Sequence, residues 1–284
     1  MSVLVNKSTN IIVQGLGKQG SFHTRLMKEY GTKIVAAISK TKKGKFEGMP
    51  LYGTVIEALK NHQADFSIIF VPAQFAKTAA LEALDQGLNL VIITEGIPVH
   101  DALEIMERAK KKNLKVIGPN TPGIISPGET KIGIMPANIF KRGKTAVISR
   151  SGTLTYEIVN QLTRNGLGQS TVVGIGGDPV IGYDFVQVLQ LLEKDPETEL
   201  ILLIGEIGGN LEEKAAQYIK SNLSKKVVAY IAGLKAPAEK KMGHAGAIIE
   251  KGTGTADSKI KALRQAGVKV ALIPSQVAEF LGNS

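Results

Sequence analysis

Short apolar runs alternate with longer helical segments along the whole chain, and this alternation limits the folds open to it. In the first half, apolar runs at residues 10–13, 33–38, 66–71, 90–93 and 115–117 are separated by helical segments at 21–30, 54–60, 73–86 and 99–111. Strands joined through helices pair in parallel by right-handed crossovers, and ligands bind at the carboxyl ends of such strands. The first half therefore predicts a parallel α/β sheet with a binding site along one edge.

The same order begins again after a glycine- and proline-rich passage that ends at Gly143. Strands are expected at residues 145–148, 171–173, 200–204, 226–231 and 269–271, and helices at 154–165, 184–194, 211–221, 258–266 and 276–281. Aromatic residues make up only 5% of the chain, and its 31 glycines suit an α/β protein better than a β-sandwich. We expect one domain over residues 1–122 and a second over 123–284.

Composition excludes several kinds of chemistry and of partner. The chain contains no cysteine, so a thiol nucleophile, a disulfide and a cysteine-ligated metal are excluded. Lys and Arg exceed Asp and Glu by 35 to 25, but no basic patch is interleaved with aromatic residues as in nucleic-acid-binding proteins. The opening MSVLVNKSTN is too short and polar for a signal peptide, and no apolar run reaches about 18 residues. We expect a cytoplasmic protein that binds neither nucleic acid nor membranes.

A glycine-rich turn follows the first expected strand. Gln14-Gly15-Leu16-Gly17-Lys18-Gln19-Gly20 lies between that strand and a helix, where glycines let backbone N–H groups face a phosphate. The second strand ends in Ser39-Lys40-Thr41-Lys42-Lys43, without the acidic residue that holds the ribose of NAD. These lysines are either ordinary loop charge or contacts to a polyphosphate. The turn therefore predicts a nucleotide-type ligand with a phosphorylated ribose, either NADP or coenzyme A.

One histidine and one glutamate are candidates for catalysis in the second half. His244 stands between small residues in Gly243-His244-Ala245-Gly246, where another group can approach the imidazole closely. Glu206 follows an apolar strand and is flanked by glycines. Both residues follow strands of one expected parallel sheet, so they should meet at one edge, where the carboxylate would fix the tautomer of the imidazole. Glycine turns at Gly152 and Gly176-Gly177 on that edge could supply N–H groups to a phosphoryl group. The alternatives are a structural histidine, and a glutamate that caps a helix or is a surface charge.

Several long segments resemble the signature sequences of the α subunit of succinyl-CoA synthetase, also called succinate–CoA ligase. They are Ile93-Thr94-Glu95-Gly96-Ile97-Pro98, Gly118-Pro119-Asn120-Thr121-Pro122-Gly123, Ser149-Arg150-Ser151-Gly152-Thr153-Leu154-Thr155-Tyr156-Glu157, Gly174-Ile175-Gly176-Gly177-Asp178-Pro179, Gly205-Glu206-Ile207-Gly208-Gly209 and Gly243-His244-Ala245-Gly246-Ala247-Ile248. The resemblance spans the chain. It implies a Rossmann-like CoA-binding domain followed by a flavodoxin-like, parallel-sheet ligase domain.

The resemblance also assigns roles. It implies that His244 becomes a phosphohistidine, that Glu206 orients its ring, and that Tyr156 lies near the acyl substrate. It places the phosphate at Ser151, Gly152 and Thr153, and CoA at Gly17, Lys18, Gln19, Lys42, Ile93, Thr94 and Glu95. It implies a β subunit of the ATP-grasp fold, in an αβ or α2β2 assembly, which binds ATP or GTP with Mg²⁺; no metal site is expected in this chain. The substrates would be succinate and CoA, in the citric acid cycle.

The chain departs from the family in its CoA-binding half. The first turn is one residue shorter than the family's Gln-Gly-Phe-Thr-Gly-x-x-Gly and lacks its threonine, and a Pro-Gly-Lys-Gly-Gly loop is replaced by Lys40-Thr41-Lys42-Lys43-Gly44. Lys40 and Lys43 could compensate by contacting CoA phosphates. Two other functions stay open: a paralogous ligase for malate or another acid, and a CoA- or NADP-binding regulatory module without catalysis.

Overall fold

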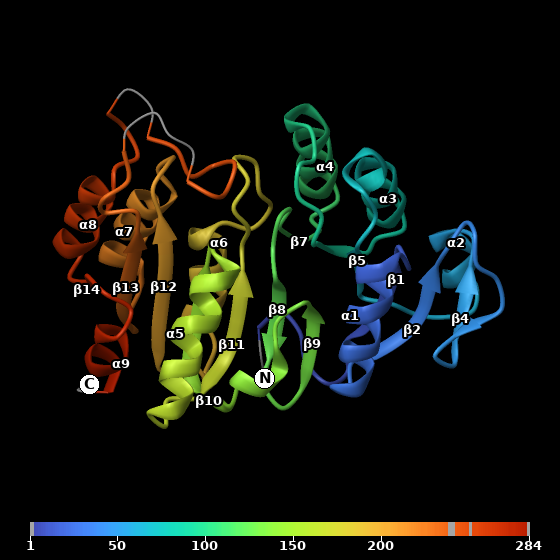
Figure 1. The fold of residues 1–284 in the computed structure, drawn as a ribbon, viewed down its shortest axis with the longest axis horizontal. Coiled ribbons are helices and arrows are strands. Elements are labelled where there is room, and N and C mark those ends of the chain that lie inside the picture. The colour runs from blue at the N-terminus through green and yellow to red at the C-terminus, as the bar shows by residue number, and fades with distance from the viewer. Residues whose placement is uncertain (1–2, 238–241, 250–251, 283–284) are drawn as a thin grey trace.

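The computed structural model describes residues 3–237, 242–249 and 252–282. In this part of the chain the strands form two seven-stranded sheets, each with helices packed on it. Figure 1 shows the first sheet on the right, in blue to green, and the second on the left, in green to red. The α/β fold class expected from the alternation is confirmed.

The first sheet has the strand order β3-β4-β2-β1-β5-β6-β7. Its pairs are parallel except for β3 with β4. Its strands are β1 (Asn10–Gln14), β2 (Lys33–Ile38), β3 (Lys45–Phe46), β4 (Met49–Tyr52), β5 (Phe66–Ile69), β6 (Asn89–Ile92) and β7 (Val116–Ile117), and its helices are α1 (Lys18–Glu29), α2 (Val55–Leu59), α3 (Ala73–Asp85) and α4 (Val99–Lys111).

The second sheet has the order β14-β13-β12-β10-β11-β8-β9. Its strands are β8 (Gly123–Ser126), β9 (Thr130–Gly133), β10 (Arg142–Ser149), β11 (Gln169–Gly174), β12 (Leu200–Glu206), β13 (Lys226–Ala232) and β14 (Lys269–Ala271). Its helices are η1 (Ala137–Ile139), α5 (Gly152–Arg164), α6 (Phe185–Glu193), α7 (Leu211–Asn222), α8 (Ala256–Gln265) and α9 (Gln276–Gly282).

Both sheets reverse their strand order at a central strand, and these reversals fix where ligands can bind. In the first sheet β1 lies between β2 and β5, and in the second β10 lies between β11 and β12. Loops leave the carboxyl ends of neighbouring strands in opposite directions at such a point and open a crevice. The glycine-rich turn follows β1 and the Ser149–Thr153 segment follows β10, so the fold places both sequence motifs at crevices.

The hairpin β8–β9 was not expected from the sequence. Its strands lie in the glycine- and proline-rich passage and join the second sheet through antiparallel pairing of β8 with β11. Every residue of both strands is buried, so no alternation of apolar and polar residues marks them. Gly123 and Gly133 are required there, because a Cβ on Gly123 would lie 2.1 Å from the carbonyl oxygen of Ile132. The pairing of β3 with β4 was missed as well, since both strands are very short.

The two halves share buried surface. One apolar core contains residues of the first sheet, such as Val13 and Ile68, together with Ile124 and Ile148 of the second. The Thr32 hydroxyl donates to the carbonyl oxygen of Lys131 at 2.7 Å and accepts from its N–H at 3.1 Å, which ties the start of β2 to β9. The sheets therefore meet along the hairpin rather than through a free linker.

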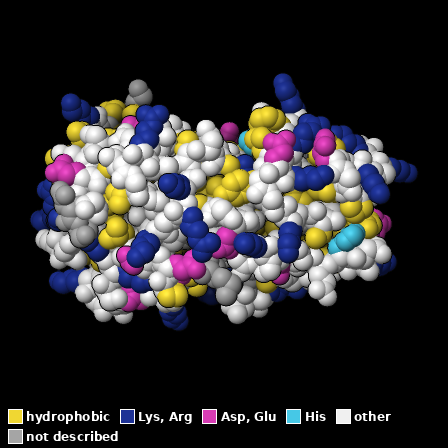
Figure 2. All heavy atoms as spheres, turned by 90° about the horizontal axis from the view of Figure 1, so that it is seen from below, with side chains coloured by type: hydrophobic (Ala, Val, Ile, Leu, Met, Phe, Trp, Pro, Cys, Tyr) yellow, Lys and Arg dark blue, Asp and Glu magenta, His cyan; other side chains and the backbone are white. Residues whose placement is uncertain are grey.

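Across the described residues, none of the helices has the length and apolar character needed to cross a membrane. Figure 2 shows one face of the molecule, on which Lys and Arg side chains are interspersed with acidic and apolar ones.

Candidate active site and cofactor cavity

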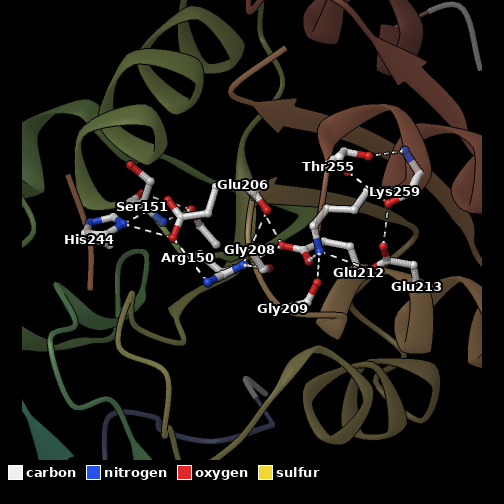
Figure 3. A network of polar contacts seen from close by, with 12 residues as sticks. Arg150, Ser151, Glu206, Gly208, Gly209, Glu212, Glu213, His244, Thr255 and Lys259 are labelled. Carbon is white, nitrogen blue, oxygen red and sulfur yellow. Dashed lines mark hydrogen bonds and ion pairs between the residues drawn. The ribbon is translucent and has the colours of Figure 1, made fainter. Parts of the chain in front are cut away.

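His244 and Glu206 meet in the structure. Glu206 is the last residue of β12 and pairs with Ala232 at the end of β13, so the chain that leaves β13 returns to the same edge of the sheet with His244. The imidazole Nδ1 lies 2.8 Å from Glu206 Oε2 and 3.0 Å from Oε1 (Figure 3). The glutamate side chain is 7% exposed and that of the histidine 27%. The pair therefore has a buried carboxylate and an imidazole that a ligand can reach.

This contact decides which ring nitrogen is available for chemistry. A carboxylate only accepts hydrogen bonds, so Nδ1 of His244 carries the proton and Nε2 keeps its lone pair in the neutral ring. The hydrogen bond that His244 donates to Glu206 raises the pKa of the imidazole above its usual value; partial burial and the charge of Arg150 oppose the shift, and Asp178 adds to it. Glu206 thus stabilises a positive charge on the ring, whether it arises from protonation or from attack by Nε2 on an electrophile.

Gly177 forms the surface against which the imidazole lies. A Cβ at this position would stand 2.3 Å from Cγ of His244 and 2.6 Å from its Nδ1. The Gly177 carbonyl also accepts the Gly246 N–H at 3.0 Å, and its own N–H donates to Asn120 at 3.3 Å. The expectation that this N–H would serve a phosphoryl group was therefore wrong, because it is already used within the backbone; Gly177 instead makes room for the ring.

The amino end of α5 is a candidate anion site on this edge. Ser151 is the N-cap residue, and its hydroxyl accepts from Leu154 at 3.4 Å. The N–H groups of Gly152 and Thr153 belong to the first turn, where no intrahelical acceptor exists, and the helix dipole favours a negative charge. The end of β10 is paired with β12, which ends in Glu206, so the predicted phosphate residues and the histidine–glutamate pair share one edge.

Tyr156 stands one turn further along α5. Its hydroxyl lies 3.8 Å from the position that a Cβ on Gly152 would occupy, so it is next to this candidate anion site. Burial raises its pKa to about 12. At neutral pH the side chain is therefore an uncharged hydroxyl that can donate a hydrogen bond to a carboxylate of a bound acid.

A cavity of about 740 Å³ opens beside the glycine-rich turn. Gly17, Lys18 and Lys42 of the predicted CoA residues line it. Gln19, Ile93, Thr94 and Glu95 are not among its described lining residues, and Thr94 donates through its hydroxyl to Val71 at 2.7 Å. The structure thus brings together only part of the predicted set.

Two glycines of the turn, Gly15 and Gly20, are required by close packing, whereas Gly17 has open space and lines the cavity. A Cβ on Gly20 would lie 2.0 Å from the carbonyl oxygen of Gly15, and one on Gly15 would lie 2.9 Å from Val71 N. Helix α1 begins at Lys18, three residues earlier than expected, with Gly17 as its N-cap residue. Close packing of the turn and α1 against the residues that follow β5 therefore directs the amino end of α1 toward the cavity.

The cavity suits a ligand that is both negatively charged and partly apolar. Lys18, Lys40 and Lys42 line it, and the Lys42 ammonium is held by the carbonyl oxygen of Leu16 at 2.8 Å. Phe75 of α3, which the sequence analysis missed, adds an exposed aromatic side chain. It could have been found as a residue that follows the carboxyl end of a parallel strand. These residues fit CoA, which combines several phosphates with an adenine ring.

Fold and site together define an α/β protein with a polyanion cavity at one sheet and a histidine–carboxylate centre at the other. Its sequence matches the CoA binding domain over residues 6–96 and the CoA-ligase family over 148–269. It is 56% identical to the α subunit of the ADP-forming succinate–CoA ligase of Aquifex aeolicus, over all of this chain and 94% of that one. The chain belongs to the family of succinate–CoA ligase α subunits.

Further proteins are similar to this chain over nearly its whole length. The α subunit 2 of the ADP-forming succinate–CoA ligase of Archaeoglobus fulgidus is 56% identical over 100% of this chain and 99% of its own length. Among solved structures, ATP citrate lyase from Methanothrix soehngenii, in complex with citrate and coenzyme A, is similar with a TM-score of 0.88 and 27% identity. That likeness covers 99% of this chain, which spans 51% of the length of the lyase chain.

Proposed function

We propose that this chain is the α subunit of an ADP-forming succinate–CoA ligase, and that His244 carries the phosphoryl group between nucleotide and acid. The contact of 2.8 Å between Nδ1 of His244 and Glu206 carries this proposal. It leaves Nε2 as the nucleophile, at the edge of the sheet where α5 begins. The names of the relatives support ADP as the nucleotide product.

The reaction proceeds in three reversible displacements. Nε2 of His244 attacks the γ-phosphorus of ATP and ADP leaves; Glu206 stabilises the resulting positive ring. A carboxylate oxygen of succinate then attacks the phosphorus and releases the neutral imidazole, which gives succinyl phosphate. The thiol of CoA gives its proton to solvent, its sulfur attacks the acyl carbon of succinyl phosphate, and the bond from that carbon to the phosphate oxygen breaks, so that inorganic phosphate leaves and succinyl-CoA forms. Negative charge on the transferred group is stabilised by the first-turn N–H groups of Gly152 and Thr153.

The remaining site residues divide between the acid and CoA. Tyr156, with its uncharged hydroxyl, positions the acid beside the α5 amino end. CoA binds with its phosphates at Gly17, Lys18 and Lys42 and extends its thiol arm to the second sheet. Gln19, Ile93, Thr94 and Glu95 stay predicted CoA contacts from the resemblance.

A second subunit completes this assignment. We propose a β subunit of the ATP-grasp fold that binds the nucleotide with Mg²⁺, in an αβ or α2β2 assembly. The name "subunit alpha" of the relatives supports a partner. The division into domains at residues 1–122 and 123–284 and the cytoplasmic location remain predictions; the first sheet ends at Ile117 and the second starts at Gly123.

The test is phosphorylation of the chain together with its β partner. With ATP and Mg²⁺, intact mass spectrometry should show the gain of one phosphoryl group that is labile in acid and stable in alkali. A His244→Asn variant, which keeps a polar side chain without the nucleophile, should show no gain. A complex that binds nucleotide but gains no phosphoryl group would refute the proposal and favour a regulatory CoA-binding module. Comparing succinate with malate as acceptor then identifies the acid.

A further inference from the structure

Charged side chains continue inward from the histidine–glutamate pair. Behind Glu206 lies the Arg150 guanidinium, then the Glu212 carboxylate at the start of α7, then the Lys259 ammonium from α8 (Figure 3). Arg150 Nη2 is 3.4 Å from Glu206 Oε1, Arg150 Nη1 is 3.2 Å from Glu212 Oε1, and Lys259 Nζ is 2.5 Å from Glu212 Oε2. The side chains of Arg150, Glu212 and Lys259 are 3%, 0% and 0% exposed. The signs of the charges alternate from the reactive ring into the interior.

Stability does not explain this arrangement. Removing charges from water costs several kcal/mol per ion, and apolar residues of the same volume often serve a protein core as well or better. The chain nevertheless leaves space for these ions. A Cβ on Gly205 would lie 2.6 Å from Cγ of Glu212, and one on Gly246 would lie 3.1 Å from Arg150 Nη2. Glycines beside Glu206 and His244 thus accommodate the buried charges.

The buried charges also hold the backbone that carries the catalytic carboxylate. Glu212 accepts the N–H of Glu206 at 3.1 Å. Arg150 donates to the carbonyl oxygens of Glu206 at 3.4 Å and Gly208 at 3.1 Å. Lys259 donates to the carbonyl oxygen of Gly209 at 3.0 Å. The turn after β12 is therefore fixed from three side chains that do not contact the imidazole.

Arg150 is in competition with His244 for the same carboxylate. Oε1 of Glu206 is 3.0 Å from the imidazole Nδ1 and 3.4 Å from the guanidinium. An arginine with no other anion would draw this carboxylate away from the ring and weaken its effect as an acceptor. Glu212 supplies that other anion, and Lys259 balances Glu212 in turn.

We propose that Arg150, Glu212 and Lys259 are positioning residues, in which Glu212 neutralises Arg150 so that the Glu206 carboxylate stays directed at Nδ1 of His244. The inference deepens the proposed function, because it concerns the group that activates the phosphoryl-accepting histidine. Glu212 acts on the ring only through Arg150 and Glu206.

The charged groups around the imidazole determine whether the pKa of His244 rises or falls in a variant. Glu206 from β12 and Asp178 from the loop after β11 raise the pKa of His244, and Arg150 from the end of β10 lowers it. Changing Glu212 to glutamine leaves Arg150 without its counter-charge and removes a negative charge from the same side of the ring. Both effects disfavour the protonated imidazole. The pKa of His244 should therefore fall, by about one unit for a charge at this depth.

The matched variants are Glu212→Gln and Glu213→Gln. Both residues are neighbours on α7 and both contact Lys259, at 2.5 and 3.0 Å, but Glu213 is 26% exposed and only Glu212 is bonded to Arg150. The pKa of His244 is measured by NMR titration of the full chain alone, with the resonance assigned by its loss in His244→Asn. We expect a fall of about one unit in Glu212→Gln and less than about 0.2 units in Glu213→Gln. An unchanged pKa in folded Glu212→Gln, or equal falls in both variants, would overturn the proposal.

A charge-balanced variant covers the case in which Glu212→Gln does not fold. Glu212→Gln combined with Lys259→Met removes both partners of the buried pair and keeps an acceptor for Arg150 and for the Glu206 N–H. A fall in the pKa of His244 is again expected, because Arg150 still loses its counter-charge, but it should be smaller than in Glu212→Gln because the positive charge of Lys259 is removed as well. If neither variant folds, the buried charges are a structural requirement and the positioning role is refuted. Because the titration needs no partner or nucleotide, it is independent of the phosphorylation test of the proposed function.

Discussion

Gly177→Ala tests the reasoning about the site most directly, because it adds a single methyl group under the imidazole. The backbone at Gly177 does not lie in the left-handed region, so alanine suits it and only the space is at issue. The new Cβ would stand 2.3 Å from Cγ, 2.6 Å from Nδ1 and 2.7 Å from Cβ of His244. Carbon atoms in contact are about 3.5–4.0 Å apart, so the ring has to retreat by more than about 1 Å.

That displacement acts on the contact with Glu206. The hydrogen bond of 2.8 Å would be stretched beyond the range in which it fixes the tautomer. A misplacement of about 1 Å can reduce a rate about 100-fold, which corresponds to about 2.7 kcal/mol in the activation free energy. Overpacking should also lower the free energy of unfolding by about 1–3 kcal/mol, which leaves the variant folded.

The assay is rapid-quench phosphorylation of the chain by ATP in the complex with its β partner. Gly177→Ala should phosphorylate about 100-fold more slowly than the wild type. Gly282→Ala is the matched control, since nothing lies within 4 Å of the added Cβ at the end of α9. Thermal melting of both variants checks the fold. A folded Gly177→Ala chain that is phosphorylated at the wild-type rate would show that the ring does not act from the position described.

Three further predictions concern pH, CoA and the glycine turn. Phosphorylation of His244 should slow as the pH falls through a midpoint above 6.5, because the pKa of His244 is raised and only the neutral ring attacks. Single-turnover rates measured across pH test this prediction, and a rate that does not change with pH would contradict it. Lys40→Ala should weaken CoA binding by about threefold to fivefold and Lys43→Ala by less, because Lys40 is among the described lining residues of the cavity and Lys43 is not. Calorimetric titration measures both affinities, and a double variant with unchanged affinity would refute a role of these lysines in phosphate contacts. Gly20→Ala should lower the free energy of unfolding by about 2–4 kcal/mol, since its Cβ would lie 2.0 Å from a backbone carbonyl oxygen. Gly17→Ala is the comparison, because space is open there, and equal melting temperatures of the two variants would be inconsistent with this packing.

The meeting of Glu206 with His244 could be predicted because it follows from topology. Residues that end parallel strands of one sheet share an edge, and β12 and β13 are neighbours. The sequence distance of 38 residues between them was no obstacle, because helix α7 and strand β13 return the chain to the same edge of the sheet. What topology could not supply was the surface beneath the ring. Gly177 comes from a different loop, and its role depends on a contact that only packing creates.

For the CoA cavity, the sequence predicted the place but not the complete set of lining residues. The glycine-rich turn and the basic end of β2 predicted a ligand there, but Phe75 comes from α3 and is marked only by its position after the carboxyl end of β5. Conversely, Ile93 to Glu95 were expected there on resemblance and lie outside its described lining. Residues from several separate segments line a cavity, whereas a sequence motif identifies only one of those segments.

By itself, the sequence determined the α/β class, the two series of strands, and the residues able to do chemistry, because periodicity and residue type are local properties. Only the tertiary structure decided how those residues are held. Every residue of the hairpin strands β8 and β9 is buried, so they lack a periodic signal, and the charges behind Glu206 come from the residue after β10 and from α7 and α8. From the sequence alone, an arginine or a glutamate is expected at the surface, because its burial requires an oppositely charged partner that only the folded structure brings close. Such pairings are made by packing between distant elements, and no single segment of the chain specifies them.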